Sequence, residues 1–171
     1  MDSAWLAPLW VGLVVGAVID VRTRRIPNAL TFGLMAFGLG LHATQGLGIG
    51  FAAAGLGVAF LVHFSLWQAG IDAAGDAKLF MAVGTFLGVS TMLEATLWRL
   101  LLHIPFALLV LTVQGKWDNF RAATRWSLAK AQGREVGERP EPTYQPLGVV
   151  VALAVGVAYL TPWLDLSRWL P

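Results

Sequence analysis

The sequence predicts an all-α membrane protein, a polytopic bundle of about six transmembrane helices. Of its 171 residues, 57% are hydrophobic and only 13% are charged, whereas soluble domains average about 45–50% apolar and roughly 25% charged residues. The mean hydropathy is +0.67. At about 20 residues per span, this length accommodates around six helices and one modest loop. We therefore expect residues 1–171 to form a single integral membrane domain.

The charge and the residue composition exclude several classes of function. The formal net charge is +2 and the pI is near 9.4, but the basic residues lie in the predicted loops. They therefore indicate membrane topology rather than a surface for nucleic acid. The chain has no cysteine, which excludes a thiol nucleophile and any cysteine-based zinc or iron–sulfur site. His42, His63 and His103 have no metal-ligand spacing, so we expect neither a metal nor another cofactor.

The first apolar run, Ala4–Ile19, is followed by the basic stretch Arg22–Arg25. A cleaved signal peptide has the opposite charge order, so this run is predicted to be a permanent helix. Its N-terminus is expected outside and the arginines in the cytoplasm. Pro27 suits the first turn of the next helix, where its missing N–H group has no cost. That second helix is predicted at about Asn28–Leu41.

Four more apolar helices are predicted, at about Ile49–Trp67, Gly75–Val89, Met92–Val113 and Leu147–Leu160. A polar and basic segment, at about 114–146, separates the last two. Four of its residues recur near helical spacing: Trp117, Phe120, Thr124 and Leu128. The first half of this segment is therefore either an amphipathic helix on the inner leaflet or a solvated loop.

Six crossings place both termini outside. Of the twelve Lys and Arg residues, all but Arg99 and Arg168 then fall on the cytoplasmic side. This distribution agrees with the excess of positive charge that cytoplasmic loops carry.

Two aspartates are the candidate catalytic residues. Asp20 closes the first predicted helix and Asp76 opens the fourth, so both lie at the inner boundary of the membrane. Two carboxylates that approach each other do not readily both ionise, so one of them retains a proton near neutral pH. The ionised carboxylate deprotonates a water molecule while the protonated one polarises a carbonyl group. This chemistry is aspartic-type peptide hydrolysis, and no serine in the sequence has an obvious base.

Three motifs resemble those of the type IV prepilin leader peptidase family. Asp20 followed by Ile26-Pro27-Asn28 resembles the family's Asp…Ile-Pro-Asn motif, and Gly75-Asp76-Ala77-Lys78-Leu79 is similar to its Gly-x-Gly-Asp-x-Lys-Leu motif. Tyr144-Gln145-Pro146-Leu147-Gly148 is similar to a weaker family feature. The resemblance spans nearly the whole chain, with the motifs in the same order.

The resemblance implies an aspartic endopeptidase of the bacterial inner membrane. Such an enzyme removes short basic leaders from prepilin or pilin-like precursors at the cytoplasmic face of the bilayer. The resemblance assigns the catalytic pair to Asp20 and Asp76. The supporting motif residues that it carries over are Pro27, Asn28, Gly75 and Lys78.

The sequence departs from the family in two respects. Ala73 stands where the family usually has a glycine, and alanine avoids backbone conformations that glycine adopts, so catalytic efficiency is the property in question. The larger bifunctional members also methylate the new N-terminus, using a cytoplasmic region with paired cysteines. This chain has neither the cysteines nor the room, and it resembles the short peptidase-only members of Tad/Flp pilus systems.

Other charged residues have two interpretations each. Asp72 is either a third carboxylate that tunes the pair or, as we expect, a solvated acid in a loop. Lys78 either holds a substrate carboxylate or lowers the pKa of a neighbouring group, or it extends to the membrane interface. Arg99 and His103 are expected to make a structural polar contact, with Glu94 or with a neighbouring helix.

Two other functions compete with the peptidase. A small transporter or proton-conducting bundle would use Asp20, Asp76 and Lys78 as a relay, but it would place these charges at the membrane midplane rather than at its inner edge. A non-catalytic pilus-assembly scaffold would retain the fold, and Ala73 is its only indication. Intramembrane proteases of the presenilin type share the Gly-x-Gly-Asp element but lack the Ile-Pro-Asn signal.

Overall fold

The computed structural model describes residues 3–69, 71–138, 140 and 145–161, and every regular element in them is helical. The prediction of an all-α protein is therefore confirmed. The chain packs as two units, residues 1–102 with 146–171 and residues 103–145. The elements in order are a 3-10 turn η1 (Ser3–Leu6), α1 (Ala7–Thr23), α2 (Asn28–Thr44), α3 (Ile49–Gln68), α4 (Ala74–Gln114), α5 (Trp117–Ala131) and α6 (Leu147–Leu160).

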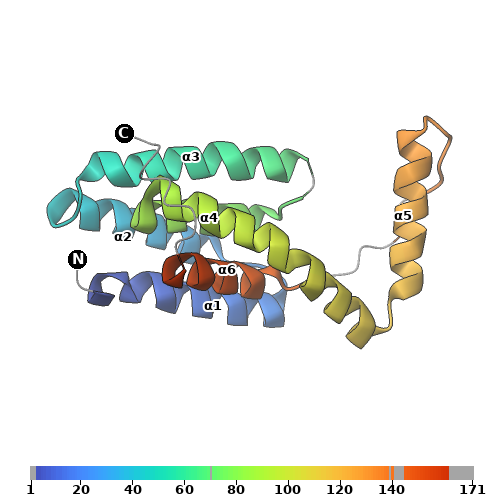
Figure 1. Ribbon diagram of the computed structural model, residues 1–171, viewed down its shortest axis with the longest axis horizontal. Coiled ribbons are helices and arrows are strands. Elements are labelled where there is room, and N and C mark those ends of the chain that lie inside the picture. The colour runs from blue at the N-terminus through green and yellow to red at the C-terminus, as the bar shows by residue number, and fades with distance from the viewer. Residues whose placement is uncertain (1–2, 70, 139, 141–144, 162–171) are drawn as a thin grey trace. The chain divides into compact units, whose positions relative to one another are not determined.

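The first unit is a bundle in which α6 packs along α1 and α2 packs against α3 (Figure 1). The helix α1 extends one turn past the predicted end at Ile19, so Asp20 lies inside its last turn. The helix ends because Arg24 adopts a left-handed conformation with φ 59° and returns its N–H to the carbonyl of Asp20, at 2.8 Å. This is a common way to end a helix, and it starts the turn toward α2 directly after Asp20.

The helix α4 contains the two helices predicted at Gly75–Val89 and Met92–Val113, joined by a kink at Gly88. Gly88 has φ 73° and ψ −173°, in a region that side chains disfavour. The chain reverses direction at this kink. The evidence is an ion pair between Asp72, which precedes α4, and Arg99, which follows Gly88. A straight helix would hold these two residues about 40 Å apart. The side chain of His42 contributes to the kink, since its Nε2 donates to the Phe86 carbonyl at 3.1 Å.

Close helix packing depends on small residues. A Cβ atom at Gly55 of α3 would collide with the backbone of Gly84 in α4, and a Cβ atom at Gly84 would collide with that of Gly55. Gly12 of α1 similarly lies against the side chain of Leu34 in α2. In lipid, such backbone proximity compensates for the missing hydrophobic drive between helices.

The distribution of polar side chains is that of a membrane protein. Large apolar side chains face outward, for example Val14, Phe37 and Leu61, while a set of polar residues is buried. The buried polar set comprises Asp20, Thr31, His42, His63, Asp72, Asp76, Thr85, Glu94, Thr96 and Arg99.

Two helices are long and apolar enough to cross a membrane by length and composition. They are α3 and α4, with mean hydropathies of 1.9 and 1.8 over their most apolar windows. Only 22% and 17% of these windows are buried inside the protein, so most of their apolar surface faces outward. The helix α6 is apolar but shorter, with 14 residues.

The second unit contains the amphipathic segment. A helix was one of two alternatives for the first half of the basic segment, and α5 confirms it. Its apolar side chains at Trp117, Phe120 and Leu128 are exposed. The indole N–H of Trp126 donates to the carbonyl of Gly137 at 2.8 Å and so ties the helix to the chain that follows it. Attachment of α5 to a leaflet remains a prediction. Tyr144 and Arg168, which figured in the sequence argument, and Arg139 of the basic segment lie outside the described residues.

Candidate active site

Asp20 is buried at the end of α1, with 7% of its surface exposed. Its Oδ2 accepts a hydrogen bond from the backbone N–H of Gly148, at 3.0 Å. Gly148 is the second residue of α6, where backbone N–H groups have no partner inside the helix and attract a carboxylate. A Cβ atom at position 148 would lie 3.2 Å from both the Cβ and the Oδ2 of Asp20. The glycine therefore permits the N-terminus of α6 to approach the aspartate.

Asp76 is the third residue of α4 and is 3% exposed. Its carboxylate accepts a hydrogen bond from the backbone of Ala73, the residue before the helix. A carboxylate at this position that reaches back to the preceding N–H stabilises the start of a helix. Asp76 is therefore held in place by the helix that it begins.

The structure brings the two aspartates to the same end of the bundle. Gly16 of α1 lies beside Leu79 of α4, since a Cβ atom at position 16 would lie 3.8 Å from the leucine side chain. Asp20 follows Gly16 by one turn, and Asp76 precedes Leu79 by one turn, so both project from the same faces as this contact. The two carboxylates are close enough to interact electrostatically. They form a single buried acidic site between α1 and α4.

The supporting motif residues join α2 to α4 beside this site. The amino group of Lys78 donates to Oδ1 of Asn28 at 2.8 Å and lies 5.6 Å from the ring centre of Phe32. Gly75 faces Ile26, since a Cβ at position 75 would lie 3.3 Å from that of Ile26. The two sequence motifs therefore contact each other directly. Lys78 has a structural partner, which neither interpretation of it from the sequence included.

The sequence predicted Pro27 in the first turn of α2. In the structure Pro27 instead directly precedes this helix. Its φ of −64° and ψ of 136° are extended. Its carbonyl accepts the N–H groups of Leu30 and Thr31 at 3.1 and 3.3 Å. Pro27 is thus the residue that caps α2, just outside the helix, and Asn28 is the first helical residue.

The interpretation of Asp72 as a solvated loop acid is wrong. Its side chain is fully buried and contacts two basic side chains. His63 Nδ1 lies 2.6 Å from Asp72 Oδ2, and Arg99 Nη2 donates to Asp72 Oδ1. The expected structural polar contact of Arg99 is thus confirmed, with Asp72 as its partner. Because Arg99 is buried in the bundle, it does not count as an outer loop charge in the topology argument.

A signal for this cluster exists in the sequence. His63 and Arg99 are ionisable residues within apolar helices, and such residues in a membrane nearly always have a buried partner. Asp72 is the acid nearest to His63 along the chain. Its position in a predicted loop favours solvent exposure, and this local signal was misleading.

The alanine at position 73 fits its backbone. The only described non-glycine residue with a positive φ is Arg24, so Ala73 adopts an ordinary conformation. Its side chain is exposed. The departure from the family's glycine therefore introduces no backbone strain at this position.

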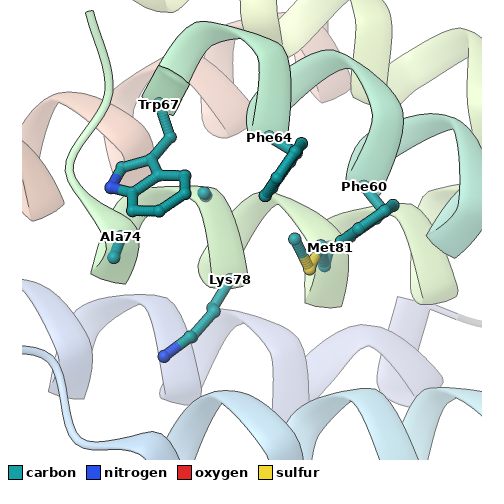
Figure 2. A pocket seen from close by; sticks show the side chains of 7 residues that line it. Phe60, Phe64, Trp67, Ala74, Lys78 and Met81 are labelled. Carbon is teal, nitrogen blue, oxygen red and sulfur yellow. The ribbon is translucent and has the colours of Figure 1, made fainter. Parts of the chain in front are cut away.

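An apolar pocket of about 300 Å³ lies between α3 and α4 (Figure 2). Figure 2 shows the aromatic side chains of Phe60, Phe64 and Trp67 on one wall, and the amino group of Lys78 pointing away from them. Lys78 is two residues from Asp76, which places the two side chains on different faces of α4. The pocket is therefore separate from the acidic site.

The described residues contain no group of three or more His, Cys, Asp or Glu side chains that could hold a metal ion. Among the described residues, His63 contacts Asp72, whose carboxylate also accepts a hydrogen bond from Arg99. The carboxylate is thus engaged by a cation of the protein itself.

Fold and site together define an all-helical protein with long apolar helices and two buried aspartates at one end of its bundle. Residues 7–108 match the profile of the type IV leader peptidase family. This match includes both aspartates and α1 to α3 in full. The chain belongs to the type IV leader peptidase family, which is a family of aspartic endopeptidases.

One curated relative extends this result. A stretch of 85 residues is 35% identical to the prepilin leader peptidase/N-methyltransferase of Escherichia coli (strain K12). The match covers 44% of this chain and 37% of that protein, so more than half of the relative has no counterpart in the alignment. No solved structure matches the chain significantly.

Proposed function

We propose that this protein is a membrane-embedded aspartic endopeptidase that removes the short basic leader from prepilin or pilin-like precursors. The observation that carries the proposal is the convergence of Asp20 and Asp76, from two helices, in one buried acidic site. Family membership supports the reaction class and the substrate class. The active site faces the cytoplasm in this proposal, and six apolar segments cross the inner membrane, with α4 contributing two of them.

The proposed reaction needs only water and the two carboxyl groups. The ionised carboxylate takes a proton from the attacking water, and the other carboxylic acid donates a hydrogen bond to the scissile carbonyl. The water oxygen bonds to the carbonyl carbon and forms a tetrahedral intermediate. Its collapse breaks the C–N bond, and a proton passes from a carboxyl group to the leaving amine. The two products are a carboxylate on the leader and a free amino terminus on the pilin.

In this proposal the residues around the pair have separate roles. The N–H of Gly148 orients the carboxylate of Asp20. The start of α4 orients Asp76 through Ala73. The contact of Lys78 with Asn28 keeps α2 and α4 together at this end of the bundle. Catalysis of this kind depends on holding the reacting groups in place before the substrate arrives.

The decisive experiment is co-expression with pilin-like precursors encoded in the same genome. Mass measurement of the precursor N-termini should show loss of the basic leader and an unmodified new amino group. Cleavage by the purified protein should persist in excess chelator, because the chain has no cysteine and no clustered histidines. Intact leaders on every precursor, despite correct insertion of the protein, would contradict the proposal, and a methylated product would contradict the peptidase-only form.

A further inference from the structure

Asp72 is held from two sides inside the bundle. The Nδ1–H of His63 donates to one carboxylate oxygen and Nη2 of Arg99 donates to the other. A carboxylate only accepts hydrogen bonds, so His63 carries its proton on Nδ1. All three side chains are fully buried. The loop before α4 is thereby attached both to α3 and to the part of α4 beyond the Gly88 kink.

The surroundings fix the orientation of these side chains. The Nε2 atom of His63 lies 3.0 Å from the hydroxyl oxygen of Thr96. Its ring stacks on Phe80 with a centroid distance of 4.1 Å and an interplanar angle of 13°. The Arg99 guanidinium lies 5.9 Å from the centre of the same Phe80 ring. The order carboxylate, imidazole, hydroxyl is that of a hydrolytic triad, but a triad needs access to substrate, and His63 is fully buried.

We propose that the His63–Asp72–Arg99 network is a positioning device, which fixes the loop before α4 and thereby holds Asp76 opposite Asp20. Asp72 precedes Asp76 by four residues, and Ala73 between them provides the backbone hydrogen bond to Asp76. Movement of Asp72 therefore moves the group that orients Asp76. The guanidinium of Arg99 also interacts electrostatically with the Asp76 carboxylate.

Burial explains why this network positions a loop better than an apolar contact would. A hydrogen bond is directional, and in a medium of low dielectric a charged one is strong. An apolar side chain in the same place would keep the loop near the bundle without fixing its register. The kinetic part of the test rests on the proposed peptidase function, whereas the geometric part does not.

The geometric test uses the full chain, which has no native cysteine. The double substitution Asp20→Cys and Asp76→Cys is treated with a short thiol-bridging reagent, and the bridged fraction is measured per folded molecule. The same measurement is made after Asp72→Asn. It is repeated with Asp72→Asn plus Arg99→Met, because removing both partners avoids the unpaired buried charge that destabilises a single variant.

The matched control is His42→Ala, which removes another buried histidine. His42 is 1% exposed and makes two hydrogen bonds, to the Phe86 carbonyl and from the Leu47 N–H. It lies at the other end of α2 from Asn28, about 21 Å away along the helix. This control removes two buried hydrogen bonds, one of them to the Phe86 carbonyl near the kink, but leaves the contacts of Asp72 with His63 and Arg99 in place.

We expect bridging to fall several-fold in both Asp72 variants and to remain at the unsubstituted level with His42→Ala. In the protein that keeps Asp20 and Asp76, the Asp72 substitutions should lower kcat for precursor cleavage about 100-fold and change KM little. This loss is expected when reacting groups shift by about 1 Å. Arg99→Lys should retain much of the activity. The Nε and Nη1 atoms of Arg99 have no hydrogen-bond partner among the described residues, so a lysine keeps the one ionic contact.

Unchanged bridging and unchanged kcat in the folded Asp72→Asn, Arg99→Met protein would overturn the positioning role. A rise in KM with constant kcat would also overturn it, because the network would then act on substrate affinity. If the unsubstituted protein cleaves no precursor, the proposed function fails. In that case the bridging measurement alone decides the inference.

Discussion

The amino group of Lys78 donates a hydrogen bond of 2.8 Å to the side-chain oxygen of Asn28, and this bond joins the N-terminal ends of α4 and α2. These two residues belong to different sequence motifs that lie 50 positions apart. The two motifs are therefore in direct contact, and each of them contains one of the two candidate aspartates. Each motif supplies one acidic residue and one residue that holds the other motif.

Substitution of Lys78 or Asn28 should lower stability through this shared bond. A double-mutant cycle with Lys78→Met and Asn28→Ala should give a coupling free energy of about 1 kcal/mol, since a hydrogen bond to a charged group contributes about 1.5–3 kcal/mol when buried and less when exposed. Thermal unfolding in detergent measures it. Strict additivity of the two substitutions would show that the contact contributes nothing.

The two aspartates should behave as one unit in cleavage assays. Asp20→Asn and Asp76→Asn should each abolish cleavage, and the double variant should be no worse than either, because members of a catalytic unit are strongly non-additive. The matched control is Asp118→Asn in α5, whose side chain is 94% exposed. That control should cleave normally. Near-normal cleavage by either single variant at position 20 or 76 would end the aspartic peptidase interpretation.

Gly148→Ala should reduce kcat for cleavage while the protein remains folded. An added Cβ would lie 3.2 Å from Asp20 Oδ2 and 3.3 Å from the Cα of Ala17, so α6 or Asp20 must shift by a few tenths of an ångström. We expect about a tenfold loss of kcat, given that a displacement of about 1 Å costs about 100-fold. Gly156→Ala in the same helix has nothing within 4 Å and serves as the control. Equal activities of the two variants would contradict this role of Gly148.

Gly88→Ala should destabilise the bundle strongly. The φ of 73° costs a side chain about 1–2 kcal/mol, and the new methyl group would in addition collide with the ring of Phe51. A lower melting temperature in detergent is the expected result. Gly57→Ala, which has nothing within 4 Å, should change the melting temperature little. A melting temperature unaffected by Gly88→Ala would show that the kink adjusts freely.

Neutralising Arg121 and Arg125 in α5 should weaken activity only modestly. A basic residue near an anionic membrane surface contributes about 1 kcal/mol. Cleavage by Arg121→Gln, Arg125→Gln protein should therefore fall mainly in vesicles with anionic lipid and remain normal in zwitterionic vesicles. Complete loss of cleavage by a folded and inserted protein would show that α5 is as essential for cleavage as the two aspartates.

The sequence predicted the helical architecture because helices depend on local signals. Apolar runs reveal the helices, and Asp20 and Asp76 interrupt such runs near helix ends, which is where the structure has them. The division between the predicted fourth and fifth helices, after Val89, also agrees closely with the kink at Gly88. These features need no knowledge of what packs against what.

The partners of buried polar groups were not predictable in the same way. Asp72 contacts His63 and Arg99, which are 9 and 27 residues away. A single sequence shows that each of these residues needs a partner, but it does not show which one is near. The hydrogen bond between Asp20 and Gly148 was not predictable from the sequence either, because it depends on how α6 packs along α1.

That bond has a consequence for biosynthesis. The N–H group that orients Asp20 lies 128 residues further along the chain. At a translation rate of roughly 5–20 residues per second, roughly 6–26 s pass between the synthesis of Asp20 and that of Gly148. During this interval the first helices have already been made, while the aspartate lacks the helix terminus that orients it. The nascent chain therefore reaches its complete acidic site only after α6 has been made and has packed along α1.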